Sequence, residues 1–319
     1  MRNAQALASF LLRGAFISSR GPALGSVVDR RILYTAFHSF SGFRSSTDLS
    51  DKSSFKSVPF ALAGAVSFSV AAASSVAHAK EQLAAERLPQ NVVLYQYEAC
   101  PFCNKVKAFL DYHSIPYKVV EVNPLTKKEI KWSDYQKVPI LTVDGEPLVD
   151  SSDIIDKMSQ KIHPDEPILK DEEEKKWRKW VDDHLVHMLS PNIYRSTSEA
   201  LEAFDYITSN GNFSFMERFS VKYAGAAAMY FVSKKLKKRH NITDERAALY
   251  EAAETWVGAL NGRHFLGGSK PNLADLAVFG VLRPIRYLKS GKDMMENTTI
   301  GEWYGRMESV VGNSSRISA

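Results

Sequence analysis

The sequence predicts an α/β domain followed by an all-α domain, both behind an N-terminal segment of different composition. Two observations predict this fold class. Between about 90 and 165 the spacing of apolar residues changes several times, in the order β-α-β-(α)-β-β-α, whereas from 171 to 312 only helical spacing recurs. At about 100–200 residues per domain, a chain of 319 residues allows two domains with sizeable cores.

Short β-branched or apolar runs predict four strands in the α/β part, at 92–96, 117–122, 139–143 and 147–149. Asp144-Gly145 separates the last two strands and is a strong signal for a two-residue hairpin turn. Helices are predicted over 101–113 and from Ser151 onward, because apolar residues there recur on one face. These elements make one compact domain over 90–165.

Helical spacing fills the second part of the chain and predicts a helical domain over 171–312. Asn272 and Asp275 form a capping-box pattern, in which each side chain accepts a hydrogen bond from the backbone amide of the other residue. We expect helices at 173–188, 200–210, 215–238, 244–260, 273–287 and 300–310.

Residues 1–57 are rich in Arg and Ser and poor in acidic residues, which is typical of a mitochondrial or plastid transit peptide. The alternative is a tail without targeting function. The segment holds eight Lys or Arg and three Asp or Glu, so it accounts for the whole formal charge of +5. The rest of the chain is neutral and gives no electrostatic reason to expect nucleic acid as a partner.

Residues 58–79 carry no formally charged side chain, and some 20 residues of helix cross a bilayer core of about 30 Å. The sequence therefore predicts a single-pass membrane anchor here, in a mitochondrial or plastid membrane, with the Golgi or another endomembrane as the alternative. Two other interpretations stay open. One is a cleaved targeting region, because Ala77-His78-Ala79 is similar to a cleavage site, and the other is a buried Ala-rich helix.

Cys100 and Cys103 are the only cysteines of the chain, and Cys100 stands between a predicted strand and the first turn of a predicted helix. Unpaired amides and the helix dipole at that position favour a thiolate, which is the nucleophilic form of cysteine. Cys103 lies one turn further and can resolve a mixed disulfide. The alternatives are half of a metal site or two inert thiols; two cysteines do not make a four-cysteine zinc site, and we predict no metal.

Three short segments resemble known active sites. Cys100-Pro101-Phe102-Cys103 is similar to the glutaredoxin dithiol, and Val138-Pro139 to the cis-proline loop of the thioredoxin superfamily. Asp150-Ser151 resembles the acidic-Ser pair with which glutathione S-transferases hold glutathione. A more specific resemblance, over about 90–310, is to the microsomal prostaglandin E synthase type 2 family. It is carried by YQY at 95–97, CPFC at 100–103, VVEVNP at 119–124, KVPIL at 137–141 and KPNLADLAV at 270–278.

The resemblance implies a thioredoxin-fold, glutaredoxin-like domain, a glutathione transferase-type helical domain and bound glutathione. Val138 would pair through its backbone with the cysteine of glutathione, as an added strand does. Ser151 at a helix N-terminus would hold a carboxylate, and Asp150 would pair with the α-ammonium. From the residues alone, Val138-Pro139 is equally a strand start and Asp150-Ser151 a simple helix cap. The resemblance also implies heme, for which the sequence has no motif of its own, and a homodimer.

A cleft for substrate or heme is predicted beside the dithiol. His184, His187 and Ser190 have the spacing i, i+3 and i+6 and lie near one face of a helix. The alternative is that they are surface residues of a polar helix. The other expected lining residues are Tyr97 and Phe102, which flank Cys100.

Glu98 departs from what the dithiol needs, because it stands two residues before Cys100. A nearby carboxylate raises the pKa of a thiol. Lys105 and Lys107 would offset the effect of Glu98 only if their helical faces turned back toward Cys100.

The function expected from these residues and the resemblance is a membrane-associated, thiol-dependent isomerase. It would convert a hydrophobic lipid endoperoxide, prostaglandin H2, into prostaglandin E2 through the Cys100 thiol. One alternative is a glutaredoxin-like, glutathione-dependent thiol–disulfide oxidoreductase or glutathione transferase, for which Cys103 is the discriminating residue. The other alternative is a non-catalytic module that binds glutathione or heme.

Overall fold

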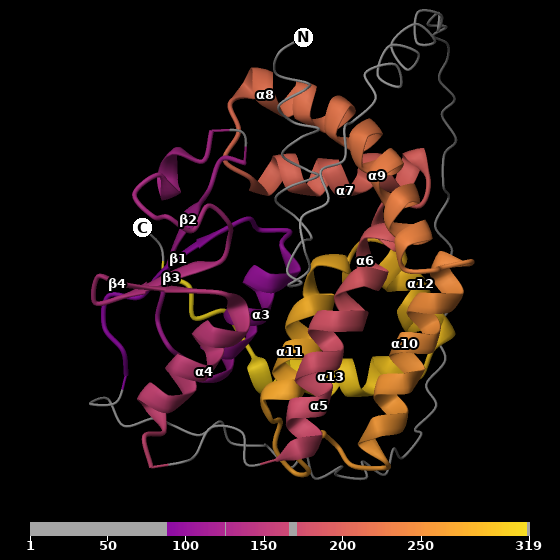
Figure 1. The fold of residues 1–319 in the computed structure, drawn as a ribbon. Coiled ribbons are helices and arrows are strands. Elements are labelled where there is room, and N and C mark those ends of the chain that lie inside the picture. Colours follow the sequence, from indigo (N-terminus) through magenta and orange to yellow (C-terminus); the bar gives the residue numbers. More distant parts are fainter. Residues whose placement is uncertain (1–87, 125, 166–170, 318–319) are drawn as a thin grey trace, which may run out of the picture. The chain divides into compact units, whose positions relative to one another are not determined.

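The computed structural model describes residues 88–124, 126–165 and 171–317, which belong to one compact unit. A mixed four-stranded sheet with its helices comes first in the chain, and a helical domain follows it (Figure 1). The predicted fold class is therefore confirmed. The exact domain limits, 90–165 and 171–312, stay a prediction.

The sheet contains β1 (Val93–Gln96), β2 (Lys118–Glu121), β3 (Ile140–Val143) and β4 (Glu146–Val149), in the order β2-β1-β3-β4. β1 pairs in parallel with β2 and antiparallel with β3, and β3 pairs antiparallel with β4. Asp144 and Gly145 join β3 to β4 with φ angles of 54° and 89°. Two positive φ values are what a two-residue hairpin turn requires, and Asp-Gly accepts them.

Two helices complete the α/β part and carry the dithiol and the Asp-Ser pair at their N-termini. α3 (Pro101–Tyr112) follows β1, and Pro101 fits its first turn, where a missing N–H costs no hydrogen bond. α4 (Ser151–Ile162) follows β4 and buries Ile154, Ile155, Met158 and Ile162, an apolar stripe at helical spacing. α4 packs against both α3 and β4.

The helical domain has more breaks than the sequence pattern indicates. Two of the predicted helices are each divided by one π-helical turn, at Val181–Leu185 and at Val221–Gly225, and the helix predicted to end at Tyr287 stops at Leu282. Its helices are α5 (Glu172–Trp180), α6 (Val186–Ile193), α7 (Thr197–Asn210), α8 (Phe215–Ser220), α9 (Ala226–Arg239), α10 (Glu245–Leu260), α11 (Leu273–Leu282), α12 (Lys289–Asn297) and α13 (Ile300–Val311).

The predicted capping box is present at the start of α11. Asn272 Oδ1 accepts hydrogen bonds from the amides of Ala274 and Asp275, both at 3.1 Å, and Asp275 Oδ2 accepts from the Asn272 amide at 3.0 Å. Asp275 is fully buried, and its Oδ1 also accepts from the Leu266 amide and from the Trp303 indole N–H. This carboxylate therefore fixes the entry to α11 against the preceding loop and α13.

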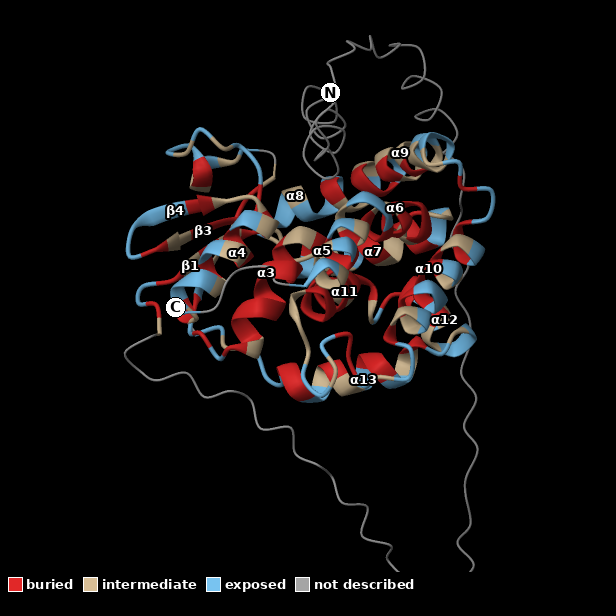
Figure 2. Cartoon of the chain, turned by 60° about the horizontal axis from the view of Figure 1, so that its bottom comes forward, coloured by how far each residue is buried: buried red, intermediate tan, exposed pale blue. Residues whose placement is uncertain are grey.

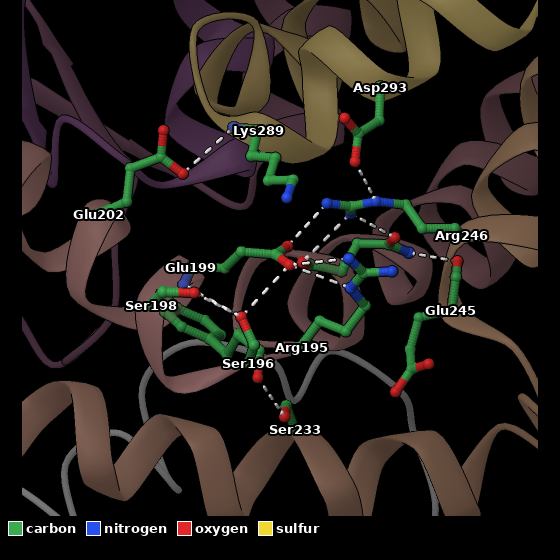
Figure 3. A network of polar contacts seen from close by, with 12 residues as sticks. Arg195, Ser196, Ser198, Glu199, Glu202, Ser233, Glu245, Arg246, Lys289 and Asp293 are labelled. Atoms are coloured by element: carbon green, nitrogen blue, oxygen red, sulfur yellow. Dashed lines mark hydrogen bonds and ion pairs between the residues drawn. The ribbon is translucent and has the colours of Figure 1, made fainter.

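A second buried charge network, around Arg246, holds α6, α7, α10 and α12 together (Figure 3). The Arg246 guanidinium donates to Glu199 Oε2 at 2.7 Å, to Asp293 Oδ2 at 2.9 Å and to Asn192 Oδ1 at 2.8 Å. Arg246 and Glu199 are both buried. Because each buried charge has a hydrogen-bonded counter-charge, the network is a structural element of the helical domain.

The C-terminal segment returns to the sheet. The Tyr117 amide, just before β2, donates to the Ser315 carbonyl at 3.3 Å, and the Ile317 amide donates to the Tyr117 carbonyl at 2.9 Å. The fully buried Asp111 of α3 lies beneath this contact. It accepts hydrogen bonds from the Tyr117 hydroxyl, from the Ser315 amide and from the Arg283 guanidinium. Residues 315–317 are thus tied to α3 and to the residue that precedes β2.

α11 packs along α3, and both helices are largely buried (Figure 2). Gly280 of α11 faces the backbone of α3. A Cβ atom at Gly280 would lie 2.5 Å from Lys105 Cα and 2.8 Å from the Asn104 carbonyl oxygen. Only a glycine leaves room for this approach, so Gly280 sets how closely the helical domain meets the helix that carries the dithiol.

The prediction of a single-pass membrane protein is wrong for the part of the chain that the structure describes. None of the helices in that part is long and apolar enough to cross a bilayer. The longest helical run, 215–239, carries charged side chains toward both ends. The anchor predicted at 58–79 and the targeting segment predicted at 1–57 lie outside the described residues.

Gly280→Ala should lower the free energy of unfolding by about 1–3 kcal/mol, because the added methyl group overpacks against backbone atoms that cannot rotate away. Gly305→Ala in α13 is the matched control, since a Cβ atom there meets nothing within 4 Å. The control should be neutral or more stable by up to about 1 kcal/mol. Denaturant unfolding of both variants measures the difference, and equal stabilities would contradict the role of Gly280.

Candidate active site

The dithiol lies where the backbone changes from strand to helix. Cys100 is the N-cap residue of α3, with φ −76° and ψ 123°, and its amide donates to the Tyr97 carbonyl at 3.0 Å. The Cys100 carbonyl accepts from both the backbone amide and the side-chain amide of Asn104, each at 3.0 Å. Cys100 is half-buried, whereas Cys103, one turn inside the helix, is fully buried. One sulfur is therefore accessible and the other is protected.

The pKa values of the two thiols are shifted in opposite directions. The hydrogen bond from the Cys103 thiol, together with the amides of Cys103 and Phe102, lowers the pKa of Cys100, even though burial opposes this. Burial and the charge on Cys100 raise the pKa of Cys103 well above its ordinary value. Cys100 is thus the more acidic thiol of the pair, with Cys103 as a hydrogen-bond donor to it; that Cys100 acts as the nucleophile stays a prediction.

Glu98 is neutralised by one of the two lysines considered above. Lys107 Nζ lies 2.8 Å from Glu98 Oε1, whereas Lys105 Nζ turns to Ser152 Oγ at 2.9 Å and Asp182 Oδ1 at 2.7 Å. Burial acts to raise the pKa of Glu98, but the ion pair and hydrogen bonds from Lys107 outweigh it, and the pKa is lowered. Lys105 instead links α3 to α4 and to the π-helical turn after α5.

Glu121, at the end of β2, is the carboxylate that affects the dithiol, and our interpretation of the sequence missed its role. Its charge acts to raise the pKa of both Cys100 and Cys103. It is half-buried and accepts from the Glu98 amide at 2.7 Å. The sequence gives one signal only: parallel strands β1 and β2 end side by side, which brings Glu121 beside Gln96.

The Val138-Pro139 peptide bond is cis, as the resemblance implies. Val138 belongs to a small buried cluster with Cys103, and Cys100 packs against the same cluster. Tyr135, another residue that we did not anticipate from the sequence, also packs there. Burial and the charges of Asp150 and Cys100 raise the pKa of Tyr135 to about 12, so this side chain is near both the dithiol and the Asp-Ser pair.

Asp150 and Ser151 stand at the start of α4. Asp150 Oδ1 accepts from the Ser152 amide at 2.9 Å, so Asp150 caps the helix, and Ser151 is buried. Helix-cap residues normally have an extended backbone, but Asp150 has φ 67° and ψ 128°. Capping alone does not require this left-handed φ, and such conformations concentrate at ligand sites.

Tyr97 and Phe102 lie on either side of Cys100, and both are half-buried. Burial and the charges of Cys100 and Cys103 raise the pKa of Tyr97 well above its ordinary value, so its hydroxyl stays protonated. The Lys105 ammonium lies 5.9 Å from the centre of the Phe102 ring. Tyr97 packs against the cluster that contains Cys103, whereas the Phe102 side chain packs against the main core, and a role of either in a substrate cleft stays a prediction.

The three cleft residues predicted in the helical domain, His184, His187 and Ser190, lie in three different environments. His184 is exposed, with its ring 5.6 Å from that of Trp180. His187 stacks on His240 at 4.3 Å, and burial together with His240 lowers its pKa to about 4. Ser190 is buried, and its hydroxyl has no hydrogen-bond partner among the described residues. A cleft that these residues share with the dithiol stays a prediction.

A mixed sheet with a cis-proline beside a helix-capping dithiol, followed by a helical domain, defines a glutathione S-transferase-like protein. A family model described as "Glutathione S-transferase, N-terminal domain" matches residues 94–166. The chain is also 45% identical over 264 residues to prostaglandin E synthase 2 of Danio rerio, covering 68% of this chain and 70% of that protein. It is 44% identical over 275 residues to prostaglandin E synthase 2 of Mus musculus, covering 71% and 72%. The chain belongs to the prostaglandin E synthase 2 family.

Solved glutathione transferases are similar at a lower level. One is the Ceriporiopsis subvermispora enzyme CsGST83044 in complex with glutathione, with 18% identity and a TM-score of 0.48 over 70% of this chain and 99% of that one. Another is human glutathione transferase theta-2, with 18% identity and a TM-score of 0.47 over 70% and 83%. Family membership makes the chain an enzyme, either an isomerase or a glutathione-dependent transferase.

Iodoacetamide at neutral pH should modify Cys100 and spare Cys103 in the folded, reduced protein, because Cys103 is fully buried and its pKa is raised. Tandem mass spectrometry of the peptide that contains both cysteines locates the label. In denaturant both thiols should react at similar rates, which is the control. Equal labelling of the two cysteines in the folded protein would contradict the assigned roles.

Proposed function

We propose that this enzyme is a thiol-dependent isomerase that converts prostaglandin H2, or a lipid endoperoxide like it, into the corresponding hydroxy-ketone, prostaglandin E2. The observation that carries the proposal is Cys100: a half-buried thiol at the N-terminus of α3, with a lowered pKa and a second thiol that donates a hydrogen bond to it. The relatives in Danio rerio and Mus musculus are named prostaglandin E synthase 2, which supports the choice of substrate.

The chemistry needs a nucleophile and a proton, and the site can supply both. The Cys100 thiolate bonds to one oxygen of the endoperoxide, the O–O bond breaks, and the other oxygen takes a proton and becomes the hydroxyl. The carbon that bears the sulfur-bound oxygen then loses its hydrogen as a proton to water, the C–H electrons form the ketone C=O bond, and the S–O bond breaks to release the thiolate. This proton balances the one taken up in the first step. No oxidant or reductant is consumed, and the hydrogen bond from Cys103 stabilises the thiolate before and after the reaction.

Cys100→Ser should reduce conversion of prostaglandin H2 to the rate without enzyme, because a serine hydroxyl is not ionised at neutral pH. Product analysis by mass spectrometry, with the purified full chain, measures the prostaglandin E2 formed. Cys103→Ser is the matched variant and should keep most of the isomerase activity, since a hydroxyl still donates a hydrogen bond. Full activity of Cys100→Ser would exclude the proposed mechanism.

A second candidate function is glutathione-dependent thiol–disulfide exchange, and the contact between the two thiols favours it. Here Cys100 attacks a disulfide and forms a mixed disulfide, which Cys103 or glutathione then resolves. The same two variants separate the candidates, because exchange by the dithiol route needs Cys103 and isomerisation does not. If Cys103→Ser lost both activities, this variant would not distinguish isomerisation from dithiol exchange.

Glutathione is the small molecule that the site residues fit. Ser151 would hold the γ-glutamyl carboxylate at the N-terminus of α4, and Asp150 would pair with the α-ammonium through Oδ2, since Oδ1 caps the helix. The backbone of Val138, beside the dithiol, would pair with the cysteinyl part of the ligand. The left-handed φ of Asp150 supports a ligand role beyond capping.

Asp150→Asn should weaken glutathione binding by roughly ten- to a hundredfold, because a charge-assisted hydrogen bond contributes about 1.5–3 kcal/mol. Asp153→Asn is the matched control, since Asp153 is an exposed acidic residue in the same helical turn. Isothermal titration calorimetry with glutathione gives both dissociation constants. Equal dissociation constants for the two variants would place glutathione elsewhere.

Heme is the second group that the family resemblance implies, and the imidazoles of the helical domain fit its iron. His187 is neutral at pH 7, which is the form that binds iron, and His184 is exposed one turn before it. When bound, the iron would add redox chemistry that a thiol lacks. The steps above use only residues of the chain, and the homodimer expected from the resemblance stays a prediction.

A further inference from the structure

Two carboxylates meet beside the dithiol and share one amide group. Gln96 Nε2 donates to Glu98 Oε2 at 2.6 Å and to Glu121 Oε2 at 3.1 Å. Gln96 is fully buried at the end of β1, and Glu121 stands opposite it in the register of β2. Two acidic side chains held this close repel each other unless a cation or a proton compensates them.

One cation, Lys107, lies within ion-pair distance of this pair, and its direct contact is with Glu98. Lys107 forms its ion pair with Glu98 at 2.8 Å, and Lys105 is engaged by Asp182. Over the described ranges, Glu121 has no ion-pair partner within 4.0 Å. Glu121 is therefore the member of the pair without a direct ion pair, and the charge of Lys107 compensates it only from a distance.

Glu121 also holds the backbone that leads into the nucleophile. Its Oε1 accepts from the Glu98 amide at 2.7 Å, and the next hydrogen bond along the chain closes the turn from the Cys100 amide to the Tyr97 carbonyl. The Glu121 carboxylate thus fixes a turn of four residues whose last residue is the reactive cysteine.

The pKa of the Glu121 carboxyl group lies near neutral pH, so its charge changes in the pH range in which most enzymes act. Burial is the main cause that raises the pKa of Glu121 to about 7, and the charge of Glu98 adds to it. The hydrogen bonds from the Glu98 amide and Gln96 and the charge of Lys107 act in the opposite direction. The titratable and charged groups around this site come from several elements. They are Tyr97 and Glu98 from the loop before α3, Cys100, Cys103 and Lys107 from α3, Glu129 from the turn after β2, Tyr206 from α7, Arg283 from the turn after α11, and Arg316 from the C-terminal segment.

We propose that Glu121 is a positioning residue for Cys100. It holds the turn that leads into the nucleophile, and it places a negative carboxylate near the thiolate, so that the two like charges repel each other. Above neutral pH the ionised Glu121 raises the pKa of Cys100, and below neutral pH its protonation removes this effect. The two groups then titrate together, so the thiolate fraction of Cys100 rises with pH more gradually than for a single independent thiol.

The test is the pH profile of Cys100 alkylation by iodoacetamide in the full, reduced chain. Glu121→Gln keeps an oxygen that accepts from the Glu98 amide but removes the charge. It should lower the pKa of Cys100, raise its alkylation rate severalfold near neutral pH and make the profile steeper, like that of a single group.

Glu129→Gln is the matched control. Glu129 is also half-buried and also accepts from one backbone amide, that of Asn123 at 2.9 Å, and from one side-chain amide, that of Asn212 at 3.0 Å. Its alkylation profile should coincide with that of the unmodified protein.

An alkylation profile of Glu121→Gln that matches Glu129→Gln, or a higher pKa of Cys100 in Glu121→Gln, would overturn the proposal. If Glu121→Gln does not fold, the unmodified protein still decides: a profile with the slope of one independent thiol contradicts the coupling. The effect of Glu121 on the pKa of Cys100 is independent of the proposed function; only the consequence for catalysis rests on the proposed role of Cys100. Alkylation needs no prostaglandin and no glutathione. The alkylation result can therefore hold even if the protein is not an isomerase, and the protein can be an isomerase even if Glu121 has no effect on alkylation.

Discussion

The close packing of α11 on α3 is the constraint on which the rest of this structure depends. α3 carries Cys100 at its first turn, and α11 meets the backbone of α3 at Gly280, one turn and a half further on. The buried Asp275 carboxylate fixes the other end of α11 in the helical domain. A thiol must be held still relative to the groups that lower its pKa, and two packed helices provide that rigidity better than a loop would.

The charged residues of α3 add specificity to this apolar contact, because each is directed to a different neighbour. Lys105 forms an ion pair with Asp182 and donates a hydrogen bond to Ser152. Lys107 forms an ion pair with Glu98. Asp111 forms an ion pair with Arg283 and accepts a hydrogen bond from the Ser315 amide of the C-terminal segment. Burying three charges on one helix is costly unless every one is paired. These contacts therefore fix the orientation of α3 about its own axis, and with it the direction in which Cys100 faces.

Local patterns were enough to predict the parts of the site that one segment makes by itself. The dithiol at a helix start, the Asp144-Gly145 hairpin and the capping box of Asn272 each depend on a few neighbouring residues, and all are present. Glu121 and Tyr135 could not be recognised because their importance arises from chain segments that meet only in the fold. The same holds for the directions of Lys105 and Lys107, and for the π-helical turns, which keep the helical spacing of apolar residues almost unchanged.

The contact between Tyr117 and the last residues of the chain has a consequence for self-association. β2 is an edge strand of the sheet, and an open edge offers unpaired N–H and C=O groups to any other extended chain. The C-terminal segment occupies the amide and the carbonyl of Tyr117, where that edge begins. Residues 315–317 therefore close the start of this edge at Tyr117, so that another extended chain cannot pair with the backbone of that residue.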